Sequence, residues 1–268
     1  MSKIILTENE YIGEDGLRHC AVCREAKEKM IEPRYRHVLR MDRHYRHCEC
    51  ERKQIEKEEA ERKARMHREE VERLRRAGFS SYQMRNWTFE NDNGKNPQMD
   101  YARDYVDNWP DMLKENRGLL LWGGVGAGKS FFAGCIANAL IEQEVPVLMT
   151  NFAEIINELM SWDIDKNEYI RALCRYSLLI IDDLGMERNT DFGLEQVYNV
   201  IDARWREQKP LIVTTNLTIE QLQNPPDLPH QRIYDRVCEI CVPIKIHGDS
   251  MSKERAQQNM ESFKQLIR

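Results

Sequence analysis

Glycines, a lysine and a serine stand together in a pattern that binds phosphate groups. Gly123, Gly128, Lys129 and Ser130 fit the spacing G-x-x-x-x-G-K-[ST], which requires a strand before it and a helix after it. Glycines let backbone N–H groups turn inward around phosphates, and the start of the next helix adds the positive end of its dipole. We therefore expect Lys129 to contact the β- and γ-phosphates of ATP and the Ser130 hydroxyl to bind Mg²⁺. The predicted nucleotide-binding residues are Gly123, Gly124, Val125, Gly126, Ala127, Gly128, Lys129 and Ser130. A glycine-rich turn without a ligand is the alternative, which the complete motif disfavours.

An apolar run that ends in two acids, Ser177–Asp183, is the second stretch that could do chemistry. This is the Walker B arrangement, in which Asp182 holds Mg²⁺ directly or through water and Asp183 polarises the attacking water. Alone, such a run is more simply a strand that ends in a solvated turn. Downstream of a phosphate-binding loop at this spacing, it predicts the acidic strand end of an ATPase.

A polar residue also follows the next apolar run, Leu211–Val213, after two threonines. At a strand end beside the two acids, Asn216 could orient the water against the γ-phosphate. The alternative is that Asn216 only begins a turn.

Cysteines near the start of the sequence form two close pairs, Cys20 with Cys23 and Cys48 with Cys50. Four thiolates suit tetrahedral zinc, which a small segment with little apolar content can use as its core. Only one residue separates the second pair, so a histidine could replace one of its cysteines; the candidates are His37 and His47. The other possibility is four unrelated reduced thiols.

Between the cysteine pairs, basic residues alternate with aromatic ones. The residues are Arg34, Tyr35, Arg36, His37, Arg40, Arg43, His44, Tyr45 and Arg46. Such a stretch could hold phosphates or stack on bases, or it could simply be a solvated basic face.

Composition places limits on the function. The 268 residues carry a net charge of −5 and 32% of them are charged, so the whole chain does not signal nucleic-acid binding. No apolar run approaches membrane-spanning length, and Ile4–Leu6 is too short for the core of a signal peptide. Eight cysteines without an export signal indicate thiols or metal ligands. We expect a cytoplasmic protein with no membrane partner.

The chain divides by composition into three parts. We expect residues 1–50 to form a zinc-binding module and residues 51–77, rich in Glu, Lys, Arg and Ala, to form a charged helical linker. The break at Gly78–Ser81 marks the start of a nucleotide-binding domain, residues 78–268.

Hydrophobic spacing in the third part predicts alternating strands and helices. We expect strands at 118–122, 146–150, 177–183, 211–213 and 241–246. We expect helices at 101–116, 129–144, 152–176 with an interruption around 163–167, 192–207, 231–237 and 251–267, and a proline-containing loop at 221–230. This alternation is typical of an α/β domain with a parallel sheet flanked by helices.

The motifs occur in an order that resembles the AAA+ ATPases of the DnaC/DnaI helicase-loader group. They are the phosphate loop, the two acids, Thr214-Thr215-Asn216 and a helix with Arg232 and Arg236. The resemblance covers about Gly78 to Arg268. The cysteine module resembles the zinc-binding N-terminal domain of DnaI-type loaders. The fold implied is a P-loop AAA+ sheet preceded by a small zinc-binding module and a charged helix.

The resemblance also implies roles for single residues. Asn216 matches sensor 1, and Arg236, or alternatively Arg232, matches the arginine finger that acts on a neighbouring copy's nucleotide. The catalytic residues implied are therefore Asp183, Asn216 and Arg236. The family carries its sensor 2 arginine soon after a Gly-x-Ser sequence, but here Gly248-Asp249-Ser250 is followed by Met251 and Ser252. The resemblance therefore assigns the sensor 2 role to Lys253 or Arg255.

The function implied is ATP-dependent loading of a replicative DnaB-type hexameric helicase onto single-stranded DNA, with Mg²⁺, Zn²⁺ and self-association. Residues 1–77 would hold the helicase. The 152–176 helices would face DNA, with Arg171 and Arg175 as phosphate contacts unless they pair with Asp165 or Glu168.

Two other functions compete with the loader. An IstB-type transposition helper would bind duplex DNA and a transposase, which the cysteine module argues against. A nucleotide-gated adaptor would bind ATP without useful turnover, which Asp183 and Asn216 argue against.

Overall fold

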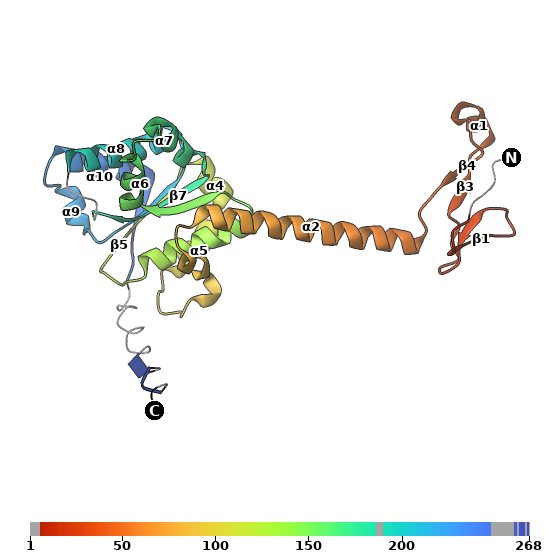
Figure 1. The fold of residues 1–268 in the computed structure, drawn as a ribbon, viewed down its shortest axis with the longest axis horizontal. Coiled ribbons are helices and arrows are strands. Elements are labelled where there is room, and N and C mark those ends of the chain that lie inside the picture. Colours follow the sequence, from red (N-terminus) through yellow and green to blue (C-terminus); the bar gives the residue numbers. More distant parts are fainter. Residues whose placement is uncertain (1–5, 186–189, 248–259, 262, 266, 268) are drawn as a thin grey trace. The chain divides into compact units, whose positions relative to one another are not determined.

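The protein consists of two compact units, residues 1–68 and residues 69–268. The computed structural model describes residues 6–185, 190–247, 260–261, 263–265 and 267 (Figure 1). Among the helices in these ranges, none combines the length and the apolarity that crossing a membrane requires.

The first unit is built from two small antiparallel pairs of strands. β1 (Glu10–Ile12) pairs with β2 (Arg18–Cys20), and β3 (Glu28–Met30) pairs with β4 (Arg43–Tyr45). A short helix, α1 (Pro33–Leu39), connects β3 to β4, and the charged helix α2 (Glu49–Gly78) begins in this unit. The predicted charged helix is therefore present.

This first unit has very little apolar core. Among its described residues the buried hydrophobic side chains are Cys20, Ile31 and Cys48. Lys27 and Glu28 are also buried, and Lys27 forms ion pairs with Glu10 and Glu51. A unit with so few buried apolar groups needs another source of stability, such as a bound metal.

The second unit is organised around a five-stranded parallel sheet in the order β6-β7-β8-β5-β9. The strands are β5 (Gly118–Trp122), β6 (Val147–Asn151), β7 (Leu178–Leu184), β8 (Leu211–Thr215) and β9 (Cys241–Lys245). All five strand predictions and the predicted α/β class are confirmed.

Helices cover both faces of the sheet. The 3₁₀ helices are η1 (Tyr82–Asn86) and η2 (Phe89–Asn91), and the α-helices that precede β7 are α3 (Met99–Asp107), α4 (Trp109–Lys114), α5 (Lys129–Glu142), α6 (Phe152–Leu159) and α7 (Lys166–Arg175). Those that follow it are α8 (Asp191–Arg206), α9 (Ile219–Gln223) and α10 (Leu228–Ile240).

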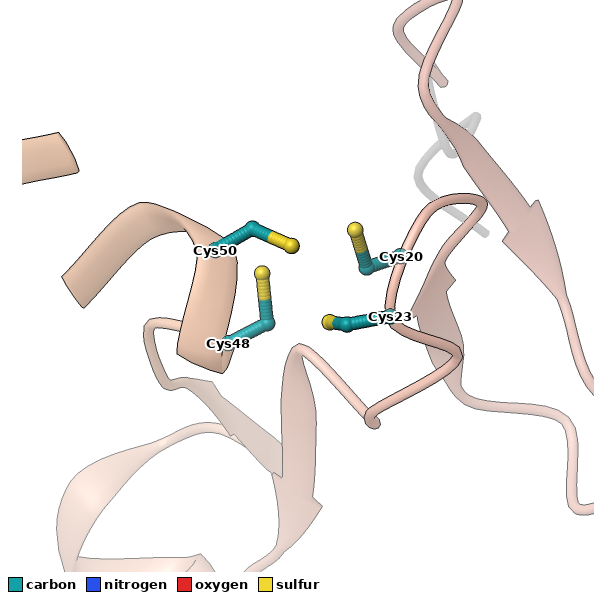
Figure 2. A group of neighbouring side chains, drawn as sticks. All are labelled: Cys20, Cys23, Cys48 and Cys50. Carbon is teal, nitrogen blue, oxygen red and sulfur yellow. The ribbon is translucent and has the colours of Figure 1, made fainter. Parts of the chain in front are cut away.

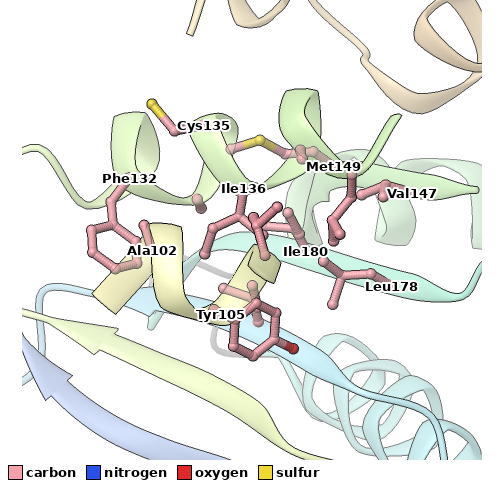
Figure 3. Close-up of a cluster of buried hydrophobic side chains, with 14 of the residues drawn as sticks. Ala102, Tyr105, Phe132, Cys135, Ile136, Val147, Met149, Leu178 and Ile180 are labelled. Carbon is pink, nitrogen blue, oxygen red and sulfur yellow. The ribbon is translucent and has the colours of Figure 1, made fainter. Parts of the chain in front are cut away.

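Alternate residues of each central strand point into two separate cores. Leu119 and Leu121 belong to a core shared with α3 and α5, part of which is drawn in Figure 3. Leu120 belongs to a core shared with α6, α8 and α10. This two-residue alternation follows from the pleat of a strand, and it fixes which residues at the strand ends face the same side.

Two predictions about local structure were wrong in part. The expected helix 101–116 is two helices, because Pro110 lies in the first turn of α4, where its missing N–H does no harm. The expected loop 221–230 contains the end of α9 and the start of α10. Thr218 and Gln221 form a capping box for α9, and the Asp227 side chain caps α10. The expected helix 251–267 falls mainly on residues outside the described ranges.

Candidate functional site

The loop between β5 and α5 has a backbone that only glycine adopts without strain. Gly123, Gly126 and Gly128 have φ values of 152°, 81° and 93°. A Cβ atom on Gly123 would also lie 2.5 Å from the carbonyl oxygen of Ile246. The glycines of the motif therefore let the chain turn sharply at the carboxyl end of β5, directly before the helix N-terminus.

Lys129 begins α5 and its side chain turns back over this loop. Its ammonium Nζ donates hydrogen bonds to the carbonyl oxygens of Gly123 (3.1 Å) and Gly124 (3.0 Å) and to Oδ1 of Asn216 (2.6 Å). Burial lowers the pKa of Lys129, although the charges of Asp183 and Asp182 oppose this shift. The predicted lysine and the predicted polar strand-end residue are therefore in direct contact.

The two acids lie at the carboxyl end of β7, beside the phosphate loop. The Ser130 hydroxyl donates to Oδ1 of Asp182 at 2.8 Å. Mg²⁺ prefers oxygen ligands, and this contact places a hydroxyl oxygen beside a carboxylate oxygen. This geometry brings together Ser130 and Asp182, which the sequence predicts as the magnesium ligands.

Asp183 has an unusual backbone for a residue other than glycine. Its φ is 60°, and the pairing between β7 and β8 shifts register between Ile181 and Leu184. Strained backbone of this kind often occurs at functional sites. Burial, together with the charge of Asp182, raises the pKa of the Asp183 carboxyl. A raised pKa makes the carboxylate a stronger base, which suits a group that accepts a proton from an attacking water.

Thr214 connects the two acids, and the sequence analysis did not give it a role. Its Oγ1 donates to Oδ1 of Asp182 at 2.6 Å and accepts from the backbone N–H of Asp183 at 2.9 Å. Thr214 is completely buried on β8. Its sequence signal is that a polar residue directly follows the apolar run Leu211–Val213, in the strand after the one that carries the acids.

The two arginines of α10 have different surroundings. Arg236 is held within its own chain: it bonds to Asp202 (3.1 Å) and Glu239 (2.6 Å), and its guanidinium lies 3.9 Å from the centre of the Trp205 ring. Arg232 is exposed and lines a cavity of about 310 Å³ with Asp191, Leu194, Glu195, Tyr198 and Pro229. The predicted sensor 2 residues Lys253 and Arg255 lie outside the described residues.

A second candidate site is the cysteine cluster of the first unit. The sulfur atoms of Cys20, Cys23, Cys48 and Cys50 all lie within 4.8 Å of one another, and Figure 2 shows them converging on one point. Sulfur atoms bound to one tetrahedral zinc are separated by about 3.8 Å, so the cluster fits this ion. A hydrogen bond from the backbone N–H of Glu25 lowers the pKa of Cys23 to about 6, whereas the hydrogen bond to Cys23 raises the pKa of Cys50 to about 11. Cys23 is therefore the thiol of the cluster that ionises more readily.

Neither histidine considered as a substitute ligand belongs to this cluster. His47 points its Nδ1 toward Glu51 at 3.6 Å, and His37 lies on α1. Among the described residues, these four cysteines are the one group of three or more Cys, His, Asp or Glu side chains that lie close enough to share a metal ion.

Fold and site together define a class of protein. A parallel sheet flanked by helices, with a phosphate loop after one strand and paired acids at the end of another, is a P-loop nucleotide-binding domain. Residues 47–259 match the family described as IstB-like ATP binding protein, and the chain belongs to this family.

Three curated relatives illustrate the range of this similarity. Uncharacterized protein YdaV of Escherichia coli is 25% identical over 61% of this chain and 62% of its own length. The replicative helicase loader DnaI of Bacillus subtilis is 24% identical over 56% of this chain and 52% of its own. An ATP-binding protein in an insertion sequence of Mycobacterium tuberculosis is 30% identical over 54% and 57%. The chain thus spans less than two thirds of each relative.

Solved structures agree on the fold. A crystal structure of DnaI superposes with a TM-score of 0.53 at 22% identity, over 64% of this chain and 94% of that one. DnaA of Aquifex aeolicus with bound AMPPCP superposes with a TM-score of 0.51 at 13% identity, over 66% and 55%.

Proposed function

We propose that this protein hydrolyses ATP and loads a replicative, DnaB-type hexameric helicase onto single-stranded DNA. The observation that carries this proposal is a separate unit, residues 1–68, which contains the cysteine cluster. Most of this unit precedes residue 47, where the family match begins. Binding and hydrolysis of ATP have no need of such a module, so we assign it to a partner. The relative named as a helicase loader supports a helicase as that partner.

In the proposed ATPase site, Lys129 contacts the β- and γ-phosphates while Ser130 and Asp182 hold Mg²⁺. Mg²⁺ neutralises charge on the phosphates when it is bound. Asp183 accepts a proton from the attacking water, and Asn216 orients that water. The hydrogen bonds that join Lys129 to Asn216 and Ser130 to Asp182 support these assignments, because they bring four of the five proposed groups together at the carboxyl end of the sheet.

Self-association is proposed because an arginine of α10 would complete the site of a neighbouring copy. Arg236 and Arg232 are the candidates. The bonds of Arg236 to Asp202 and Glu239 favour Arg232 as the group that reaches the neighbour. Mixing a Lys129→Ala protein with either Arg232→Ala or Arg236→Ala protein separates them. The variant that has lost the finger regains activity when mixed, because the Lys129→Ala protein supplies its arginine to the variant's intact nucleotide site. A variant that is inactive for internal reasons stays inactive.

Single-stranded DNA is proposed to bind the ATPase unit beside α7, with an affinity that ATP changes. Arg171 and Arg175 both form ion pairs with Glu168, and both are well exposed. Exposed ion pairs contribute only about 0–1 kcal/mol, so DNA phosphates can compete with Glu168 for these arginines.

Truncation tests how the two units divide the work. Val71 and Leu74 at the end of α2 pack in the ATPase core, so the truncated protein should begin at Glu69. We expect residues 69–268 to retain ATP-dependent binding of single-stranded DNA and to lose capture of the helicase. Full-affinity capture by the truncated protein would contradict this division.

A transposition helper is the second candidate function, because the family name and the insertion-sequence relative favour it. It predicts tighter binding to duplex than to single-stranded DNA and capture of a transposase. A nucleotide-gated adaptor would bind ATP with no measurable turnover. Binding titrations with both forms of DNA and a steady-state ATPase assay distinguish the three functions.

A further inference from the structure

Helix α1 presents apolar side chains to solvent and buries none of its own residues. Val38 is 76% exposed, Leu39 52%, Met41 50% and Tyr35 47%. We call Tyr35, Val38, Leu39 and Met41 the α1 patch. Single exposed apolar residues need no explanation, but a group within one short segment marks an interaction surface.

Three residues of the α1 patch lie on one side of the helix, and Met41 follows the helix end. Tyr35 lies three and four positions before Val38 and Leu39, so the three side chains are neighbours on the helix surface. The buried Ile31 anchors the segment: its N–H donates to the carbonyl oxygen of Asp42 at 2.9 Å, and its carbonyl oxygen accepts from Arg36 at 2.7 Å. The patch is therefore presented by an ordered segment.

Positive charge borders the patch. Three nearby arginines have acidic partners within the unit, since Arg34 pairs with Glu32, Arg43 with Glu28 and Arg46 with Glu25. In the described part of the chain, Arg36 and Arg40 form no ion pair with a carboxylate. Arg40 ends α1, directly between the apolar residues Leu39 and Met41. An apolar surface with two uncompensated guanidinium groups fits an apolar groove with acidic residues at its rim.

We propose that the α1 patch docks into an apolar, acid-rimmed groove on a protein partner. This inference rests on the proposed function, in which that partner is the replicative helicase. Protein is favoured over nucleic acid because Val38, Leu39 and Met41 have no aromatic face on which a base could stack. The one ring of the patch, Tyr35, is already covered by the Arg34 guanidinium, 4.7 Å from its centre.

The test uses the full chain and the purified helicase. A Val38→Asp/Leu39→Asp protein should capture the helicase about 30-fold more weakly, the effect of losing one central contact of an interface. Arg40→Glu should weaken capture as well, by a factor that shrinks as salt is added. Met66→Asp is the matched control, because Met66 is 58% exposed on α2 in the same unit and lies outside the patch. Zinc content and ATP turnover should stay at the parent level in all three.

The outcomes separate this inference from the proposed function. Parent-level capture by the Val38→Asp/Leu39→Asp protein would overturn the α1 patch while leaving helicase loading intact. Absence of capture by the unaltered chain would overturn both. If the double variant loses only its affinity for a fluorescent oligothymidylate, the surface binds nucleic acid and the inference is wrong. If it loses only self-association in sedimentation, the surface binds a second copy and the inference is also wrong.

Discussion

Replacing Thr214 by valine tests whether the hydroxyl between the two acids supports catalysis. Valine keeps the shape of the side chain and removes the group that donates to Asp182 and accepts from the N–H of Asp183. The N–H of Asp183 then loses its partner beside a buried strand, which costs about 1–3 kcal/mol. Because this N–H fixes the backbone from which the Asp183 carboxyl projects, we expect the loss to appear in the chemical step.

A loss of about 2 kcal/mol in the transition state corresponds to about a 30-fold lower kcat. The assay is steady-state ATP hydrolysis at several ATP concentrations, with affinity for a non-hydrolysable analogue measured separately. We expect kcat to fall while KM and analogue affinity change little, because the hydrogen bonds of the Thr214 hydroxyl within the described residues go to the two acids and not to the phosphate loop. Thr214→Ser retains the hydroxyl and should recover most of the rate. Equal kcat for Thr214→Val and the parent would refute the role, and so would an equal loss in Thr214→Ser.

Four further outcomes are expected. Lys129→Ala should abolish nucleotide binding in a fluorescence titration, because it removes the charge that faces the triphosphate. As the pH is lowered, kcat should fall when Asp183 becomes protonated, and because its pKa is raised this fall should occur above the ordinary pKa of an aspartate. Asp183→Asn should bind ATP without turning it over. Arg204→Met should lower the free energy of unfolding in urea by about 3 kcal/mol, because the buried Arg204 guanidinium donates to the carbonyl oxygens of Tyr176, Ser177 and Pro210. Elemental analysis of protein purified without chelators should find one zinc per chain, and a finding of none would remove the metal assignment.

What could be predicted from the sequence depended on how far apart the interacting residues lie along it. The phosphate loop is one continuous stretch whose glycine spacing carries its own geometry, and the strands show as apolar runs. The four cysteines were grouped correctly because close pairs limit the options. Thr214 and Arg204 were missed because their partners lie on other elements: Thr214 bonds across strands to Asp182, and Arg204 joins α8 to the ends of α7, β7 and β8.

The same limit applies to the arginines of α10. Their spacing placed both on one helix, but nothing in it indicated that Arg236 packs against Trp205 and bonds to Asp202 on α8. The break at Pro110 and the capping box at Thr218 are local signals that the sequence does contain, and a stricter use of helix-capping rules would have found them.

The backbone of Asp183 has a consequence for how this protein balances activity against stability. A left-handed conformation costs about 1–3 kcal/mol in a residue other than glycine, and asparagine tolerates it at least as well as aspartate. A carboxyl whose pKa is raised by folding also weakens the folded state: this penalty is absent below the pKa of the unfolded chain and complete above the raised pKa of the folded chain. At neutral pH both penalties act on one residue. Both features of Asp183 therefore lower the stability of the folded protein at neutral pH, and the proposed role in activating water gives a reason for aspartate at this position.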